Sequence, residues 1–203
     1  MTLAPIPEFA VALAIALCWP VPGHIPGYRL PFPVGDSARL IQGNNGPYGH
    51  EGHAAFAFDF VMPIGSAVTA ARTGRVVAVE SRFHDGSRRP GEENFVVIQH
   101  EDSTFGRYYH LTHDGVLVQP GALVAAGDRI GWSGNTGASA GPHLHFDVTV
   151  GCYRWGCQTI PVRFLNALPD SLVQGRTYRA TPVVLPRETS RRPGSQHPAP
   201  NHP

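Results

Sequence analysis

Short apolar runs separated by Gly and Pro fill the middle of the chain. Runs of this length that are rich in Val, Phe and Tyr and bounded by turn residues are typical of β-strands. In chain order the clearest runs are AFAFDFVM, AVTAAR, GRVVAVE, NFVVIQH, FGRYYHL, DRIGWS and HLHFDVTV. The pattern predicts an all-β fold, a compact antiparallel β-sheet or β-sandwich with long loops between its strands.

The segment VLVQPGALVAAGDRIGWSGNTG contains apolar pairs and Gly at close intervals. Such spacing is typical of tight hairpins and corners in a compact sheet. Lipoyl-carrier domains share this pattern, but they need a modifiable Lys at a hairpin tip. All 16 residues counted as Lys or Arg are Arg, so the carrier function is excluded.

The composition suits one domain of ordinary size with terminal extensions, since the chain has 203 residues. The 23 Gly and 20 Pro favour short strands joined by many turns, and long helices are expected to be scarce. The formal net charge is +1 and the Arg residues are spread along the sequence. This charge distribution argues against nucleic acid as a partner.

The two ends of the chain differ from its middle. Residues 9–19 (FAVALAIALCW) form an apolar run of eleven residues, too short to span a bilayer but typical of a signal-peptide core. A buried N-terminal strand or helix is the alternative. Residues 187–203 are polar and rich in Pro, so they cannot offset the entropy lost on ordering. We expect an export signal in residues 1–22, one folded domain in residues 28–185 and a disordered Pro/Arg-rich tail in residues 186–203.

Cys152 and Cys157 lie five residues apart in GCYRWGC. They would be the only two thiols left once a signal containing Cys18 is removed, and an even count in an oxidising compartment favours a disulfide. A metal-binding thiol pair is the alternative, but it would need further Cys partners that the chain lacks.

The run HLHFDVTV contains the sharpest chemical signal. Residues two apart in a strand project from the same face, so His143 and His145 can face one pocket while the alternate apolar residues are buried. Asp147 continues the polar face. Two histidines on a solvated strand face that bind nothing are the alternative.

A second element is FAFDF, in which Phe side chains alternate with Ala57 and Asp59. Asp59 then leaves the apolar face and must be hydrogen-bonded, paired or metal-bound, unless it merely caps a following turn. His50 and His53 lie just upstream. Catalytic zinc takes three ligands from His, Asp and Glu and leaves a fourth position open for water. One His, Asp59 and one His of the HLH run satisfy that count.

A third element, YYHL, ends a strand-like run with His110, and His113 is expected in the following turn. Three separate elements containing His or Asp in one β-rich domain favour a catalytic zinc bound by nitrogen and oxygen over a structural zinc.

The order of these segments resembles the lysostaphin-type (LytM-like) zinc metallopeptidases, a family of cell-wall endopeptidases. The resemblance spans roughly residues 28–164 and includes YRLPF, QGNNGPYGHEG, AFAFDFVMPIGSAVTAARTGRVVAV, NFVVIQH, RYYHL, VQPGALVAAGDRIGWSGNTG, GPHLHFDV and PVRF. It implies a peptidase domain in residues 28–185 with its loops around a metal cleft.

The resemblance also implies which residues act. It points to His50, Asp59 and His145 as ligands of one zinc ion per chain. It points to His110 and His143 as the nearby histidines credited with catalysis. The simplest members place a His four residues before the Asp, where this chain has Ala55. A subgroup has the first ligand further upstream in an H-x-G context, which favours His50. His53 stays the alternative ligand, because it lies an even number of positions before Asp59, as two residues on one face of a strand do.

The function implied by the resemblance is hydrolysis of peptide bonds in peptidoglycan by metal-activated water. His143 would take the proton of the water, and His110 would stabilise the oxyanion or protonate the amine. We expect an exported monomer, periplasmic or extracellular, that acts on peptidoglycan peptides without a stable membrane span. A catalytically silent peptidoglycan-binding protein or an activator of a cell-wall amidase is the alternative. The bond cut is left open between a D-amino-acid cross-link, a glycine-rich bridge and another peptide.

Overall fold

The computed structural model describes residues 27–169 and 171–183. Within these residues the regular structure is β-strand, apart from one 3-10 turn, η1 (Gly52–Ala54). Each of the seven predicted runs contains a strand, so the all-β fold is confirmed. The export signal expected in residues 1–22 and the tail expected in residues 186–203 lie outside the described residues. The strands are β1 (Gly27–Tyr28), β2 (Ser37–Gln42), β3 (Ala57–Val61), β4 (Ala67–Thr69), β5 (Gly74–Glu80), β6 (Phe95–Gln99), β7 (Thr104–Tyr109), β8 (Leu111–Val116), β9 (Leu123–Val124), β10 (Arg129–Ser133), β11 (His143–Val150), β12 (Arg163–Phe164) and β13 (Thr177–Arg179).

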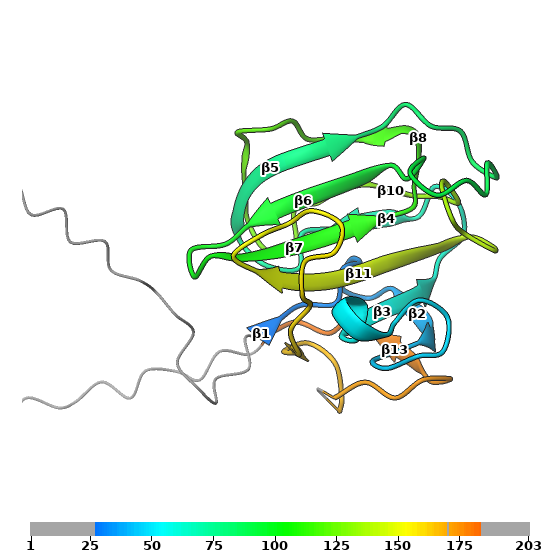
Figure 1. Ribbon diagram of the computed structural model, residues 1–203. Coiled ribbons are helices and arrows are strands. Elements are labelled where there is room, and N and C mark those ends of the chain that lie inside the picture. Colours follow the sequence, from blue (N-terminus) through cyan, green and yellow to red (C-terminus); the bar gives the residue numbers. More distant parts are fainter. Residues whose placement is uncertain (1–26, 170, 184–203) are drawn as a thin grey trace, which may run out of the picture.

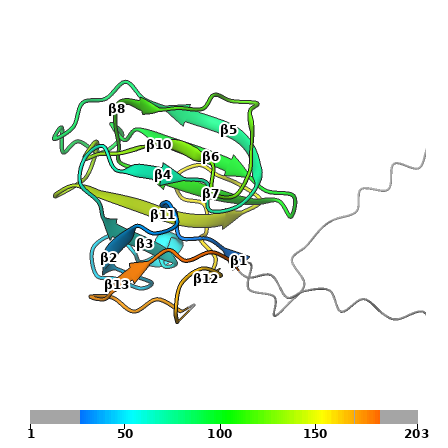
Figure 2. The ribbon, with the colours of Figure 1, turned by 180° about the vertical axis from the view of Figure 1, so that it is seen from behind.

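Two sheets pack face to face. The large sheet has eight strands in the order β13-β2-β3-β11-β7-β6-β5-β9, and the small sheet has the order β4-β10-β8. The small sheet lies behind the large one in Figure 1 and in front of it in Figure 2. Neighbouring strands in both sheets are antiparallel, as predicted, whereas β1 and β12 form a separate two-stranded parallel pair.

The core lies between the two sheets because side chains alternate along each strand. In β11, Leu144, Phe146 and Val148 are fully buried on the core side. The small sheet contributes Val68 and Ile130 to the same core. Full burial of each such side chain contributes about 1.5–3 kcal/mol. Because side chains alternate, the residues between these apolar ones lie on the opposite face of the large sheet, which can present polar side chains.

The pairing of distant strands decides two local features, and it corrects the expectation for His113. His113 lies in β8 rather than in a turn, because β8 pairs with β10. The segment expected to form tight hairpins and corners makes a corner, since β9 joins the large sheet while β10 joins the small one. Gly127 lies in the turn between them with φ 101°, a conformation that favours Gly.

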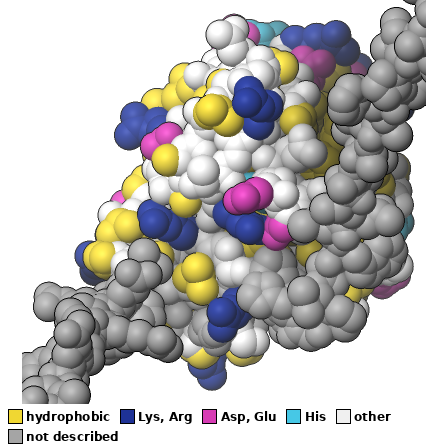
Figure 3. All heavy atoms as spheres, turned by 90° about the vertical axis from the view of Figure 1, so that its left-hand side faces the viewer, with side chains coloured by type: hydrophobic (Ala, Val, Ile, Leu, Met, Phe, Trp, Pro, Cys, Tyr) yellow, Lys and Arg dark blue, Asp and Glu magenta, His cyan; other side chains and the backbone are white. Residues whose placement is uncertain are grey.

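The surface carries charges of both signs. On the face shown in Figure 3, Arg side chains lie apart from one another among acidic, apolar and uncharged groups. No helix among the described residues is long and apolar enough to cross a membrane.

Candidate metal centre

One row of polar side chains crosses the exposed face of the large sheet. Along this row Gln42 in β2 pairs with Asp59 in β3, Asp59 pairs with His145 in β11, and His145 pairs with Tyr109 in β7. Directly opposite residues in antiparallel strands have Cβ atoms about 4.5–5.5 Å apart. The strand register therefore brings Asp59 beside His145, although 86 positions separate them in the sequence.

His50 reaches the same row from the loop between β2 and β3. Gly49 precedes it with φ 86°, a left-handed backbone conformation that would be strained in a residue with a side chain. The His50 side chain is almost fully buried, and its Nδ1–H donates to the Gly43 carbonyl at 2.9 Å. The other ring nitrogen, Nε2, lies 3.2 Å from Asp59 Oδ1 and 3.4 Å from His145 Nδ1.

These three side chains fit a zinc ion. His145 Nδ1 lies 2.9 Å from Asp59 Oδ1, so the three donor atoms are separated by 2.9, 3.2 and 3.4 Å. A tetrahedral ion bound at about 2.0–2.1 Å holds its donor atoms about 3.3 Å apart. Two imidazoles and one carboxylate are also a donor set that zinc accepts while a fourth position stays open. The spacing and chemistry of His50, Asp59 and His145 thus suit a catalytic metal.

A second set of side chains holds the candidate ligands in place. Asp147 Oδ2 accepts a hydrogen bond from His145 Nε2 at 3.1 Å, which turns His145 Nδ1 toward the other two ligands. The two oxygens of Asp147 in turn accept hydrogen bonds from Nε and Nη2 of Arg107 at 2.6 and 2.7 Å. Gln42 Nε2 donates to the second oxygen of Asp59 at 3.1 Å. Such outer partners orient a metal ligand and raise its basicity.

The charges of the centre indicate that a metal ion would replace a proton on His145. Burial alone would raise the pKa of Asp59, but hydrogen bonds with His145 and His50 hold that pKa well below its usual range. Burial alone would lower the pKa of His145, but hydrogen bonds to Asp147 and Asp59 raise it to about 10. When no metal is bound, protonated His145 and the Arg107 guanidinium together balance the charges of the two carboxylates. A metal must displace that proton, because a ligating imidazole nitrogen has to be deprotonated.

His110 and His143 lie beside the three candidate ligands, with ring centroids 4.6 Å apart. His110 directly follows β7 and has φ 66°, a left-handed conformation that is uncommon outside Gly and is often found at functional sites. The Nδ1–H of His110 donates to the Thr136 carbonyl at 2.7 Å, and that of His143 donates to the Gly141 carbonyl at 2.8 Å. Each ring thus keeps a free lone pair on Nε2, and in His143 this atom lies 3.8 Å from Asp59 Oδ1.

Both of these histidines are neutral bases. Burial, as the largest cause, lowers the pKa of His110 to about 3. Burial also lowers the pKa of His143, against the opposing effect of Asp59. At pH 7 each imidazole therefore has a protonated Nδ1 and an Nε2 that can accept a proton. Such groups suit a reaction in which water loses a proton and a leaving amine gains one.

His53, the alternative ligand, lies outside the group of three. It belongs to the η1 turn, so the argument from strand parity does not apply to it. Its ring packs against Trp155 with centroids 5.5 Å apart, and its Nε2 is buried without a hydrogen-bond partner. Of the two candidates for the first ligand, the fold brings His50 to Asp59 and His145.

Three supporting residues were not identified from the sequence. Asp147 was placed on the polar face without a role, although its spacing of two from His145 was an available signal. No local signal marks Arg107 or Gln42. Their partners are set by the register of β7 with β11 and of β2 with β3.

The candidate ligands line a cleft of about 660 Å³. Two aromatic side chains of its lining are strongly exposed, Tyr48 at 85% and Trp155 at 84%. Trp155 belongs to a loop closed by a disulfide between Cys152 and Cys157, which confirms that predicted pair. Arg107 donates a further hydrogen bond to a backbone carbonyl of this loop at 2.9 Å. The size and aromatic lining are those of a ligand-binding site.

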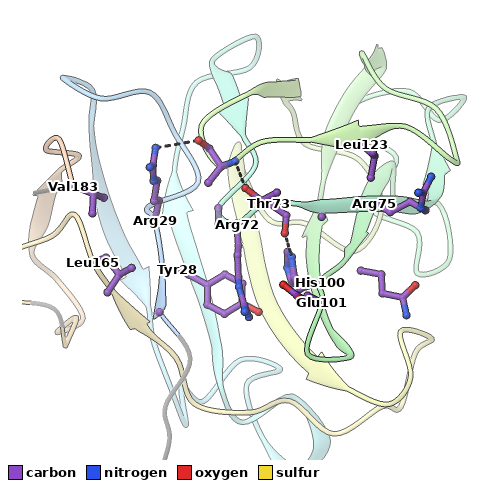
Figure 4. Close-up of a pocket in the computed structure, with 15 residues that line it drawn as sticks. Tyr28, Arg29, Arg72, Thr73, Arg75, His100, Glu101, Leu123, Leu165 and Val183 are labelled. Carbon is purple, nitrogen blue, oxygen red and sulfur yellow. Dashed lines mark hydrogen bonds between the residues drawn. The ribbon is translucent and has the colours of Figure 1, made fainter. Parts of the chain in front are cut away.

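Figure 4 shows a second cavity, of about 580 Å³, beside β1 and the start of β5. Its three arginines already make hydrogen bonds within the protein: Arg29 and Arg75 donate to backbone carbonyls, and Arg72 donates to Asp102. Among the described residues, only the first cleft brings three possible metal ligands within reach of one another. The first cleft is therefore the candidate active site.

Comparison with known families and proteins finds its match in the part of the chain that forms most of this cleft. The family model described as Peptidase family M23 matches residues 53–155, 103 of the 203 residues. The matched range contains Asp59, His110, His143 and His145, whereas His50 lies just before it.

Two curated proteins illustrate the similarity. Peptidoglycan DD-endopeptidase ShyA of Vibrio cholerae is 44% identical over 92 residues, which cover 45% of this chain and 19% of ShyA. Lysostaphin of Staphylococcus simulans is 35% identical over 124 residues, which cover 60% of this chain and 24% of lysostaphin. The crystallised catalytic domain of lysostaphin from the same organism aligns with a TM-score of 0.44 at 30% identity, over 59% of this chain and 83% of that domain. The chain thus matches about a quarter or less of the length of the two curated relatives.

Proposed function

Since the chain belongs to peptidase family M23, we propose that it is a zinc-dependent metalloendopeptidase that hydrolyses peptide bonds in bacterial peptidoglycan. The observation that carries the proposal is the convergence of His50, Asp59 and His145 at a cleft that also contains two neutral histidines. The name of ShyA as a peptidoglycan endopeptidase supports the choice of substrate.

In this proposal His50, Asp59 and His145 hold one zinc ion. The bound ion would lower the pKa of a water molecule and polarise the scissile carbonyl. His143 projects from the same face of β11 as His145, and its free Nε2 accepts the proton of the water. His110 presents its own Nε2 to the cleft, and once this atom has taken up the proton that the water releases it can donate to the oxyanion or to the leaving amine.

The proposal includes the surroundings in which the protein works. Peptidoglycan lies outside the cytoplasm, so the protein is exported to the periplasm or the cell surface, with a signal in residues 1–22. The disulfide between Cys152 and Cys157 supports an oxidising compartment. The peptidase domain comprises residues 28–185 and acts as a monomer.

The test combines metal analysis with digestion of purified peptidoglycan. The full chain is purified, its zinc content is measured, and the fragments released from peptidoglycan are identified by mass spectrometry with and without a chelator. Chelator-sensitive release of peptide fragments is expected, and the masses of the fragments identify the bond cut.

Three variants assign the roles. His145→Ala is expected to lose both zinc and hydrolysis, whereas His143→Ala and His110→Ala keep zinc and lose turnover. His113→Ala, which changes a half-exposed histidine outside the cleft lining, serves as the control and keeps both properties. Full activity in all three cleft variants would reject the site. One bound zinc without release from any peptidoglycan would favour a binding or activating role.

A further inference from the structure

The charged groups of the cleft are paired, with one exception. Asp147 is neutralised by Arg107, and Asp59 faces the candidate zinc and its histidines. Glu93 also lines the cleft. Among the ion pairs of the described residues, none includes Glu93. The cleft thus contains one carboxylate whose charge no neighbouring Arg or His balances.

The carboxylate of Glu93 is fixed in position. One oxygen accepts a hydrogen bond from the Gly91 backbone N–H at 2.9 Å, and the other accepts one from the Ala138 backbone N–H at 3.1 Å. Ala138 lies in the loop that leads to His143, and both residues line the same cleft. Glu93 is therefore held on the side of the cleft where the proposed proton-transfer groups lie.

Two backbone hydrogen bonds leave part of the carboxylate available. An ionised carboxylate offers about four lone-pair positions, of which the Gly91 and Ala138 N–H groups use two. Glu93 is half-buried rather than fully exposed. Partial burial strengthens its attraction for a cation relative to a solvated surface charge. An ammonium group has three donors and a compact charge, which match such a partly satisfied carboxylate.

We propose that Glu93 is a specificity-determining residue that binds a primary ammonium group of the substrate peptide. The inference rests on the proposed peptidase function and narrows it. A cross-link built on a diamino acid with a free amino group would be preferred over a glycine-only bridge, which lacks a side-chain cation. Glu93 takes no part in the bond cleavage itself.

The chain offers a matched control for testing Glu93. Glu92 is its neighbour in the same loop and carries the same charge, but it pairs with Arg89 and does not line the cleft. The variants Glu93→Gln and Glu92→Gln therefore remove one carboxylate each from adjacent positions.

Two peptides that differ only in one ammonium group measure the contribution of that group. One is a cross-linked stem peptide with a free amino group, and the other is the same peptide with that group acetylated. For each peptide kcat/KM is measured with the zinc-loaded full chain. Binding is measured separately in a His143→Ala background, so that the comparison of affinities does not depend on turnover.

Glu93→Gln is expected to lower kcat/KM and affinity for the free-amine peptide by roughly two- to fivefold, the upper part of the range of a partly screened ion pair. Glu93→Gln should leave kcat/KM and affinity for the acetylated peptide unchanged. Glu92→Gln should leave both quantities unchanged for both peptides. An equal effect of Glu93→Gln on both peptides, or no effect on either, would overturn the proposal.

The wild-type protein provides a test that needs no variant at Glu93. It should prefer the free-amine peptide over the acetylated one, and the preference should shrink as ionic strength rises. Equal affinity for the two peptides would reject the role of Glu93 even if Glu93→Gln failed to fold. A binding preference without hydrolysis of either peptide would reject the peptidase function and leave the ammonium site standing.

Discussion

Replacing Asp147 by Asn tests whether the buried charges behind the metal centre support it. Asp147 lies between Arg107 and His145, and it is 1% exposed. Asn has nearly the same shape but no negative charge. The Arg107 guanidinium then lacks a counter-charge, and the His145 Nε2–H loses a carboxylate acceptor. Folding stability and zinc affinity should both fall.

The two effects have separate magnitudes. Removing one partner of a buried ion pair costs about 3–5 kcal/mol, and the remaining amide oxygen places Asp147→Asn near the lower end. For a domain of about 150 residues, a loss of about 3 kcal/mol lowers Tm by about 6–12 °C. Loss of an outer hydrogen-bond partner lowers metal affinity about 10- to 100-fold, or about 1.4–2.7 kcal/mol.

Thermal unfolding and zinc competition titrations measure these quantities at a temperature where the variant is folded. Arg107→Lys separates the effects, because it loses the paired hydrogen bonds from Nε and Nη2 but leaves the Asp147 carboxylate to accept from His145. It should lower Tm while zinc affinity stays near the wild-type value. Asp114→Asn is the surface control, since the Asp114 side chain is 79% exposed, and it should change neither quantity.

One result would refute the reasoning. If folded Asp147→Asn bound zinc as tightly as the wild-type protein, Asp147 would not orient a metal ligand, and its pairing with Arg107 would serve stability alone.

Three further predictions follow from the centre and its cleft. The pKa of His145 is raised from 6.5 to about 10 in the metal-free fold, so its proton stabilises that fold fully below about pH 6.5 and the effect is lost as pH rises through about 10. Zinc binding at pH 7.5 should therefore release about one proton and tighten with rising pH, and calorimetry in buffers of different ionisation enthalpy would contradict this if it detected no release. His50→Ala should abolish zinc binding while His53→Ala retains it, and the reverse zinc contents would move the first ligand to His53. Trp155→Ala should raise KM about fivefold or more with little change in Tm, because the side chain is 84% exposed in the cleft; Leu123→Ala, a 73% exposed control outside that cleft, should leave KM unchanged.

Local patterns were sufficient to predict the fold class and several elements. Alternation of apolar and polar residues identified β3 and β11, and it placed Phe58 in the core with Asp59 on the opposite face. The disulfide between Cys152 and Cys157 was predicted from the number of thiols left once a signal containing Cys18 is removed. The strand predictions succeed because side-chain alternation is a property of the local backbone.

The sequence by itself thus determined the strands, the faces on which the histidines lie, and the residue types available for a metal. Only the tertiary structure decided that Asp59 stands opposite His145, that His50 rather than His53 reaches them, and that Arg107 holds Asp147. Each of these contacts depends on strand register or on the path of a loop. A shift of one residue would turn every side chain of a strand to the other face, so local patterns cannot specify which partners meet across the sheet.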